Sequence, residues 1–200
     1  MKPVGKRKGI QKAETRELIL ESARALFEAE GFEKTTMRAV ALHAEIGLGT
    51  IYKHFTNKVT LLAAAFLGDL THLYDSAMAS IPANISIKEQ FIHISRQFYL
   101  FYTSRPSLSR AYLVNISSMD EQATALINNF DASFTENLTI LVAQAQKHGE
   151  ISPHKNAAFV AMSLIADYFY VLGNHFLRNN ETDPDRMLEI LGKLLDQTVP

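Results

Sequence analysis

Apolar residues recur along most of the chain with the spacing of amphipathic helices, and strand-like alternation is absent. In residues 15–30, apolar side chains fall at i, i+4, i+7 and i+8, which gives one stripe of Ile19, Ala23, Leu26 and Phe27. Gly31 follows and suits a left-handed helix stop. The pattern predicts an all-α fold of about nine helices, near residues 15–30, 36–44, 47–55, 58–80, 87–104, 108–117, 121–148, 155–178 and 184–198.

Residues 35–55 have the pattern of two short helices around a tight turn. Either Thr35 or Thr36 can cap the first helix, because a hydroxyl accepts a hydrogen bond from an unpaired backbone N–H. The residues predicted to point inward are Met37, Val40, Ala41, Ala44, Ile46, Ile51 and Phe55. The second helix leaves other residues for other surfaces, namely Leu48, Gly49, Thr50, Tyr52, Lys53 and His54. The stretch is therefore predicted to be a helix-turn-helix.

The second helix of this pair has the properties that a helix needs in order to enter the major groove of DNA. Its back is apolar, and its other residues are mostly small or polar. Gly49 permits close approach of the backbone, and Thr50 can bond a phosphate or a base edge. Lys53 can reach guanine O6 and N7, and Leu48 can touch a thymine methyl group. Arg38, in the preceding helix, is predicted to reach a base or a phosphate.

Short motifs stand in a fixed order in this part of the chain: Thr15-Arg16-Glu17-Leu18-Ile19-Leu20, Ala25-Leu26-Phe27, Gly31-Phe32, Thr35-Thr36, Arg38, Val40-Ala41, Gly49-Thr50-Ile51-Tyr52, His54-Phe55, Asn57-Lys58 and Leu61. In order and spacing they resemble the N-terminal domain of the tetracycline-repressor (TetR) family of bacterial transcriptional regulators. The resemblance implies phosphate contacts from Thr36, Tyr52, His54 and Lys58. The residues themselves leave alternatives open: Tyr52 could pack between helices, His54 could be solvated or at the edge of the core, and Thr36 could be only a cap.

The chain departs from the family pattern at three positions. Glu45 stands in the turn where the family usually has Gly, so the turn is either strained or differently shaped. Gly47 replaces the usual Ser or Ala at the start of the second helix, although Gly is itself an acceptable cap. Val59 replaces a common Glu. These changes affect helix rigidity and remove no predicted DNA contact.

The last two predicted helices suit a dimer interface. Residues 157–177 are apolar on nearly every side, and a helix of this kind is buried on all sides. The resemblance implies a homodimer in which two copies of these helices pack together, while the alternative is an internal core only. Two recognition helices on a symmetric dimer would contact the half-sites of a palindromic operator in double-stranded DNA.

A ligand site is predicted in the middle of the helical bundle, where aromatic and polar groups mix: Phe98, Tyr102, Tyr112, Phe134, Tyr168 and His175. The resemblance implies a repressor that a small apolar or aromatic effector releases from its operator, with residues 58–80 linking the pocket to the DNA-binding head. The alternative is that these side chains are core. Asp167 and His175 are not interpreted as a metal pair.

Charge divides the chain into two parts that agree with these predictions. Residues 1–58 carry 11 Lys or Arg and 7 Asp or Glu, a net charge of +4, whereas residues 59–200 carry 9 and 14, a net charge of −5. Residues 1–13 are predicted to be a flexible basic arm, which either contacts DNA or is a solvated tail. We predict a DNA-binding domain at residues 14–57 and a ligand-binding and dimerisation domain at residues 58–200.

Composition excludes several classes of site. The chain has no Cys, so it has neither disulfides nor Cys-based zinc sites. A nucleophile elbow, a phosphate loop and a nucleotide-binding glycine motif are absent, so neither an enzyme nor a bound cofactor is predicted. There is no signal-peptide pattern and no run of eighteen apolar residues, which favours the cytoplasm. The remaining alternative is a helical interaction module whose helix-turn-helix does not bind DNA.

Overall fold

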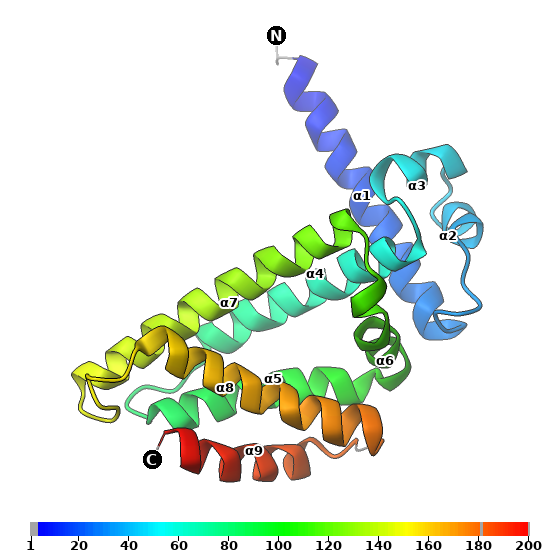
Figure 1. Ribbon diagram of the computed structural model, residues 1–200. Helices are drawn as coiled ribbons and strands as arrows, with labels where there is room; N and C mark the ends of the chain where they lie inside the picture. The colour runs from blue at the N-terminus through cyan, green and yellow to red at the C-terminus, as the bar shows by residue number, and fades with distance from the viewer. Residues whose placement is uncertain (1–3, 181, 200) are drawn as a thin grey trace. The chain divides into compact units, whose positions relative to one another are not determined.

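The computed structural model describes residues 4–180 and 182–199, and this part of the chain contains nine α-helices and no strand (Figure 1). The α-helices are α1(Val4–Ala29), α2(Met37–His43), α3(Leu48–His54), α4(Lys58–Ala79), α5(Ile87–Ser104), α6(Pro106–Asn115), α7(Glu121–Lys147), α8(Ala157–Val171) and α9(Pro184–Thr198). Two short segments add to them, a 3₁₀ turn η1(Ile116–Ser118) and a π-helical segment η2(Leu172–Arg178). The predicted all-α fold is confirmed.

The helices form two compact units. The first unit extends to Gly68 and includes Ser107–Ile127, so it holds α1 to α3, the first half of α4, most of α6 and the start of α7. The second unit holds Asp69–Pro106 and the residues from Asn128 onward. Both α4 and α7 therefore contribute residues to each unit. The units do not divide at Lys58, and the functional division into residues 14–57 and 58–200 stays a prediction.

Helix bounds agree best with the sequence where a capping side chain marks them. At the start of α5, Ser86 Oγ accepts a hydrogen bond from the Glu89 N–H, and Glu89 Oε2 accepts one from the Ser86 N–H at 2.8 Å. At the start of α9, Asp183 Oδ1 accepts from the Asp185 N–H at 2.9 Å, and Pro184 occupies the first turn. These caps fix the ends because the first N–H groups of a helix have no partner inside it.

The predicted flexible arm is the main correction to the fold. Helix α1 begins at Val4 rather than near Thr15, so residues 4–13 are helical, while residues 1–3 lie outside the described residues. Gly5 and Gly9 lower helix propensity by about 1 kcal/mol each. That penalty is tolerated because a helix nucleated by a packed segment extends easily.

Two other helix ends differ from the prediction. Helix α6 begins at Pro106, two residues before the predicted start, because Pro suits the first turn of a helix. The predicted helix 155–178 is split into α8 and η2, where the Asn179 N–H bonds to the Asn174 carbonyl at 3.2 Å in the i→i+5 pattern of a π-helix. Apolar spacing cannot reveal this change, because both helix types continue the same apolar run.

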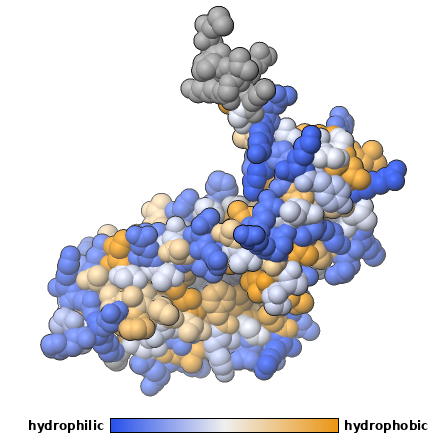
Figure 2. Space-filling model, turned by 45° about the horizontal axis from the view of Figure 1, so that its top comes forward, coloured by the Kyte–Doolittle hydropathy of each residue, from blue (hydrophilic) through white to orange (hydrophobic). Residues whose placement is uncertain are grey.

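In the second unit, α9 packs against both α5 and α8, as their adjacent ribbons show (Figure 1). Helix α8 is not buried on all sides: Phe159 is 68% exposed and Tyr170 is 56% exposed. Hydrophobic residues are visible among hydrophilic ones on the surface in Figure 2. Residues Ala157–Arg178 are long and apolar enough to cross a membrane, which the sequence pattern did not indicate. Core helices of soluble proteins have the same length and composition, so this finding is weak evidence for a membrane span.

The turn between α2 and α3 has the strain that the sequence raised as one possibility. Glu45 has a φ of 54°, in the left-handed region that favours Gly. Its N–H bonds to the Leu42 carbonyl at 3.1 Å, and the Ile46 N–H bonds to the Ala41 carbonyl at 3.0 Å. This pair of bonds closes a helix C-terminus in the Schellman pattern, whose left-handed residue is usually Gly. Gly47 then acts as the N-cap of α3.

We predict that Glu45→Gly raises the free energy of unfolding by up to about 1 kcal/mol, because Gly adopts positive φ without a Cβ clash. The greater freedom of Gly in the unfolded chain offsets part of the gain. Urea unfolding of Glu45→Gly and Glu45→Ala measures the effect, since Ala removes the same charge but keeps the Cβ. An equal gain in both variants, or a loss in Glu45→Gly, contradicts this interpretation of the turn.

Candidate nucleic-acid interface

Helix α3 is held from behind by an apolar core. Ile51 is 0% exposed and Phe55 is 1% exposed, and Val40 and Phe27 are buried in the same unit. Helix α2 packs against both α1 and α3. Met37, Ala41 and Ala44 are also buried, as predicted, whereas Ile46 is half-buried. With seven residues, α3 is too short to be stable by itself, so this packing fixes its face.

The opposite face of α3 is open to solvent. Leu48, Gly49, Tyr52 and Lys53 are exposed and lie at i, i+1, i+4 and i+5, which places them on one side of the helix. Tyr52 is 52% exposed, so it does not simply pack between helices. Thr50 is half-buried at the edge of this face. The structure thus brings the predicted base-contacting residues of α3 together.

Helix α2 adds two exposed polar residues near its start. Thr36 is the N-cap, and its Oγ1 accepts a hydrogen bond from the Ala39 N–H at 3.1 Å. A hydroxyl that accepts this bond still has its own hydrogen to donate, so capping is compatible with a phosphate contact. Arg38, two residues later in the first turn of α2, is also exposed. Thr35, the other candidate cap, is instead buried and donates to the Gly31 carbonyl at 2.9 Å.

Lys58 differs from the other predicted phosphate contacts because its side chain already has partners. Its Nζ donates to the Phe32 carbonyl at 2.7 Å and to the Glu33 carbonyl at 3.2 Å, and it lies 4.2 Å from the centroid of the Phe32 ring. These contacts tie the start of α4 to the loop after α1. An ammonium group has three hydrogens, so a phosphate would have to share the group with these carbonyls.

His54 is half-buried at the end of α3 and lies in a positive environment. Burial lowers its pKa, and the positive charges of Lys12 and Arg16 lower this pKa further. The imidazole is therefore neutral at pH 7, and a phosphate contact would use an N–H rather than a full charge. Arg16 also lies over Phe55, with its Cζ 5.4 Å from the ring centroid. This role of Arg16 was not predicted, although its spacing of four from Lys12 on a helix indicates a shared face.

The predicted ligand-binding residues fall into separate places. In the second unit, Phe98 contacts Phe134 at 5.9 Å and Tyr168 at 6.1 Å between ring centroids. Tyr102 is buried, and its ring lies 6.1 Å from that of Phe176. Burial raises the pKa of Tyr102, so its hydroxyl stays protonated. Two of the six residues lie elsewhere: Tyr112 stacks on Phe66 at 4.1 Å in the first unit, and His175 lies in η2.

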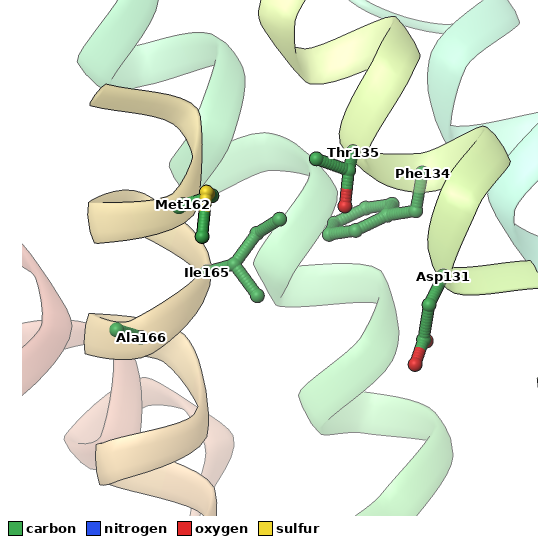
Figure 3. A pocket seen from close by; sticks show the side chains of 6 residues that line it. All are labelled: Asp131, Phe134, Thr135, Met162, Ile165 and Ala166. Carbon is green, nitrogen blue, oxygen red and sulfur yellow. The ribbon is translucent and has the colours of Figure 1, made fainter. Parts of the chain in front are cut away.

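A cavity of about 280 Å³ lies between α7 and α8 within the second unit. Phe134 of α7 and Ile165 of α8 point toward one another across it, and the Thr135 hydroxyl lies beside the Phe134 ring (Figure 3). Of the predicted ligand residues, only Phe134 lines this cavity; the other lining residues are Asp131, Thr135, Met162, Ile165 and Ala166. Asp131 and Thr135, four apart around Phe134, were the available signal in the sequence. In the described part of the chain, no group of three or more His, Asp or Glu is placed to hold a metal ion.

The sequence of this chain is similar to those of known bacterial regulators. Residues 19–65 match the family described as "Bacterial regulatory proteins, tetR family". The chain is 29% identical over 163 residues to the HTH-type transcriptional regulator UidR of Escherichia coli (strain K12), covering 80% of this chain and 81% of UidR. Over 52 residues it is 44% identical to the HTH-type transcriptional repressor KstR of Rhodococcus jostii, covering 26% of this chain and 24% of KstR.

The fold is shared with solved structures of the same kind. Thermus thermophilus FadR, a TetR family transcriptional repressor in complex with lauroyl-CoA, superposes with a TM-score of 0.72 at 18% identity, covering 92% of each chain. The family match spans α2, α3 and their buried supports, and the UidR match extends well beyond them. The chain is a DNA-binding transcriptional regulator of the tetR family, and α2 and α3 form its helix-turn-helix.

Proposed function

We propose that this regulator is a homodimeric repressor that binds a palindromic operator and is released by a small apolar or aromatic effector. The observation that carries the DNA-binding part is the division of α3 into a buried face at Ile51 and Phe55 and an exposed face that includes Tyr52 and Lys53. Such a helix can enter the major groove without losing its support.

On this proposal, the exposed residues of α2 and α3 divide the work of DNA binding. Lys53, Thr50 and Leu48 contact base edges, and Gly49 permits close approach of the backbone. The phosphate contacts, which set the register, come from Thr36, Tyr52, His54 and Lys58. Arg38 contacts either a base or a phosphate. Residues 14–57 form the DNA-binding domain, and residues 58–200 bind the effector and the second copy.

The proposed partner copy covers the exposed apolar side of α8. Phe159, Met162, Ala166 and Tyr170 are exposed at i, i+3, i+7 and i+11, so they form one stripe along the helix. An apolar stripe of this length is unusual on the surface of a monomer. A second copy related by a twofold axis offers the same stripe, and α9 lies alongside.

The proposed effector binds in the cavity between α7 and α8. Its walls are mainly apolar, with the Thr135 hydroxyl and the Asp131 carboxylate as polar anchors. Burial raises the pKa of Asp131. The complex of Thermus thermophilus FadR with lauroyl-CoA supports an apolar chain as one class of effector to test.

We predict that Lys53→Ala weakens binding to an operator selected from random DNA by about tenfold or more, because one good base contact supplies about 1–3 kcal/mol of discrimination. Lys53→Ala should reduce affinity less for an operator in which the base pair contacted by Lys53 has been changed. Fluorescence anisotropy at two salt concentrations measures both effects. Lys155→Ala, which removes an exposed Lys of the second unit, is the control. Equal affinities for wild type and Lys53→Ala would contradict the assignment.

We predict that Phe159→Lys converts the dimer into a monomer at micromolar concentration, because it places a charge in a desolvated apolar interface. Light scattering coupled to size exclusion measures the mass. Ile140→Lys, at an apolar residue of α7 that is 49% exposed, is the matched control and should stay dimeric. A monomeric wild type, or dissociation by both variants, would rule out this interface.

We predict that Thr135→Trp abolishes the thermal stabilisation produced by an effector, because the indole fills the cavity. Acyl-CoA thioesters and uncharged aromatic compounds are the first series to screen. Ala132→Trp is the control, since Ala132 is exposed on the same helix and does not line the cavity. A ligand that raises the melting temperature of both variants by the same amount binds at another site, which would contradict the proposal.

A further inference from the structure

Asp120 and Gln122, at the start of α7, contact the end of α3 and its link to α4. We call α3 the recognition helix. More than sixty positions in the sequence separate the two residues from it. Asp120 is the N-cap of α7, because its Oδ1 accepts a hydrogen bond from the Ala123 N–H at 2.9 Å. Its other oxygen, Oδ2, is not used by the cap. All of these residues belong to the first unit.

The second oxygen of Asp120 accepts three hydrogen bonds from the link between α3 and α4. The donors are the Thr56 hydroxyl, the Asn57 amide at 3.0 Å and the Thr60 hydroxyl at 2.8 Å. These bonds, led by the one from Thr56, lower the pKa of Asp120, so the carboxylate is ionised at neutral pH. Asn57 in turn caps α4 through the Thr60 N–H at 2.9 Å.

Gln122 contacts the recognition helix itself. Its Nε2 donates to the carbonyl of His54, the last residue of α3, at 2.9 Å. Its Oε1 accepts from the Thr56 N–H at 3.4 Å. A helix C-terminus leaves carbonyls without partners inside the helix, and Gln122 satisfies one of them.

These contacts matter because the other end of α3 has no side-chain support of this kind. Its N-cap is Gly47, which makes no side-chain hydrogen bond. The tilt of α3 therefore depends on the packing of Ile51 and Phe55 and on the bonds at its C-terminal end. Lys53 is adjacent to His54, so movement of that end displaces a proposed base contact.

We propose that Asp120 and Gln122 are positioning residues for DNA recognition, which hold α3 and the start of α4 in the orientation that fits the operator. The inference rests on the proposed DNA contacts of α3. The same helix α7 carries Asp131, Phe134 and Thr135, which line the proposed effector cavity. Helix α7 is thus a covalent connection between that cavity and the α3–α4 link.

The test compares Asp120→Asn and Gln122→Ala with wild type. Asn is as good an N-cap as Asp, so Asp120→Asn keeps the cap of α7. It replaces Oδ2 with an NH2 group, which cannot accept the three hydrogen bonds that Oδ2 accepts. We expect each variant to bind the selected operator about tenfold more weakly, as for a lost hydrogen bond to a charged or buried partner. Binding to random DNA should not fall, because Asp120→Asn removes a negative charge and Gln122→Ala changes none.

Asp183→Asn is the matched control, because it makes the same change at the N-cap of α9 in the second unit. It should leave the ratio of operator to random affinity unchanged. Thr60→Val is a second variant, which removes one donor and leaves the carboxylate in place, and it should lower the same ratio. Melting temperatures, measured in parallel, define the folded fraction for each affinity.

A merely structural role predicts a lower melting temperature with an unchanged affinity ratio for the folded protein. That result in Asp120→Asn and Gln122→Ala, with Lys53→Ala still impaired, overturns the positioning role and leaves the proposed DNA contacts intact. If Lys53→Ala is also unimpaired, the proposed contacts of α3 fail, and the positioning role fails with them.

Discussion

The structure depends on how a helix of only seven residues is held in place. Helix α3 is shorter than the length at which isolated helices become stable in water, so its order is supplied by its surroundings. Burial of Ile51 and Phe55 fixes which face is presented, and hydrogen bonds from Gln122 and around Asp120 fix the end that leads into α4. Recognition of DNA is therefore a property of the whole first unit.

This dependence explains how an effector could control DNA binding without touching α3. Helices α4 and α7 each contribute residues to both units. A ligand that favours one arrangement of these helices can change the orientation of α3 only through differential affinity for the two states. A nearly complete switch requires about 5.5 kcal/mol of such difference. The hydrogen bonds between the start of α7 and the α3–α4 link add to the energy that separates the two states, because a small displacement there breaks bonds to the Asp120 carboxylate.

Local signals in the sequence predicted most of the fold. The starts predicted at residues 87 and 184 are confirmed, and the structure shows that Ser86 with Glu89, and Asp183 with Pro184, cap these ends. The predicted start of α1 was wrong. Gly5 and Gly9 suggested a flexible segment, but the helix extends from its packed residues toward the N-terminus as far as Val4. The π-helical end of α8 was missed because it continues the apolar spacing of the α-helix.

Some residues of the candidate site were predicted from the sequence and others were not, because local sequence patterns do not reveal contacts between distant parts of the chain. The division of α3 into a buried and an exposed face follows from helical periodicity, whereas the phosphate role of Thr36 came from the family resemblance. Asp120 and Gln122 were not predicted because their partners are distant in the chain, and a polar residue before a helix is normally explained as a cap. The cavity was missed except for Phe134, since aromatic residues at helical spacing fill cores as well as line pockets.

The central claim is that the exposed face of α3 recognises DNA in two copies related by symmetry. Selection of DNA fragments from a random pool by the wild-type protein, at moderate salt, tests it most directly. We predict enrichment of an inverted repeat whose half-sites lie about one helical turn apart. Enrichment of no sequence, or of a single half-site without a repeat, would contradict it.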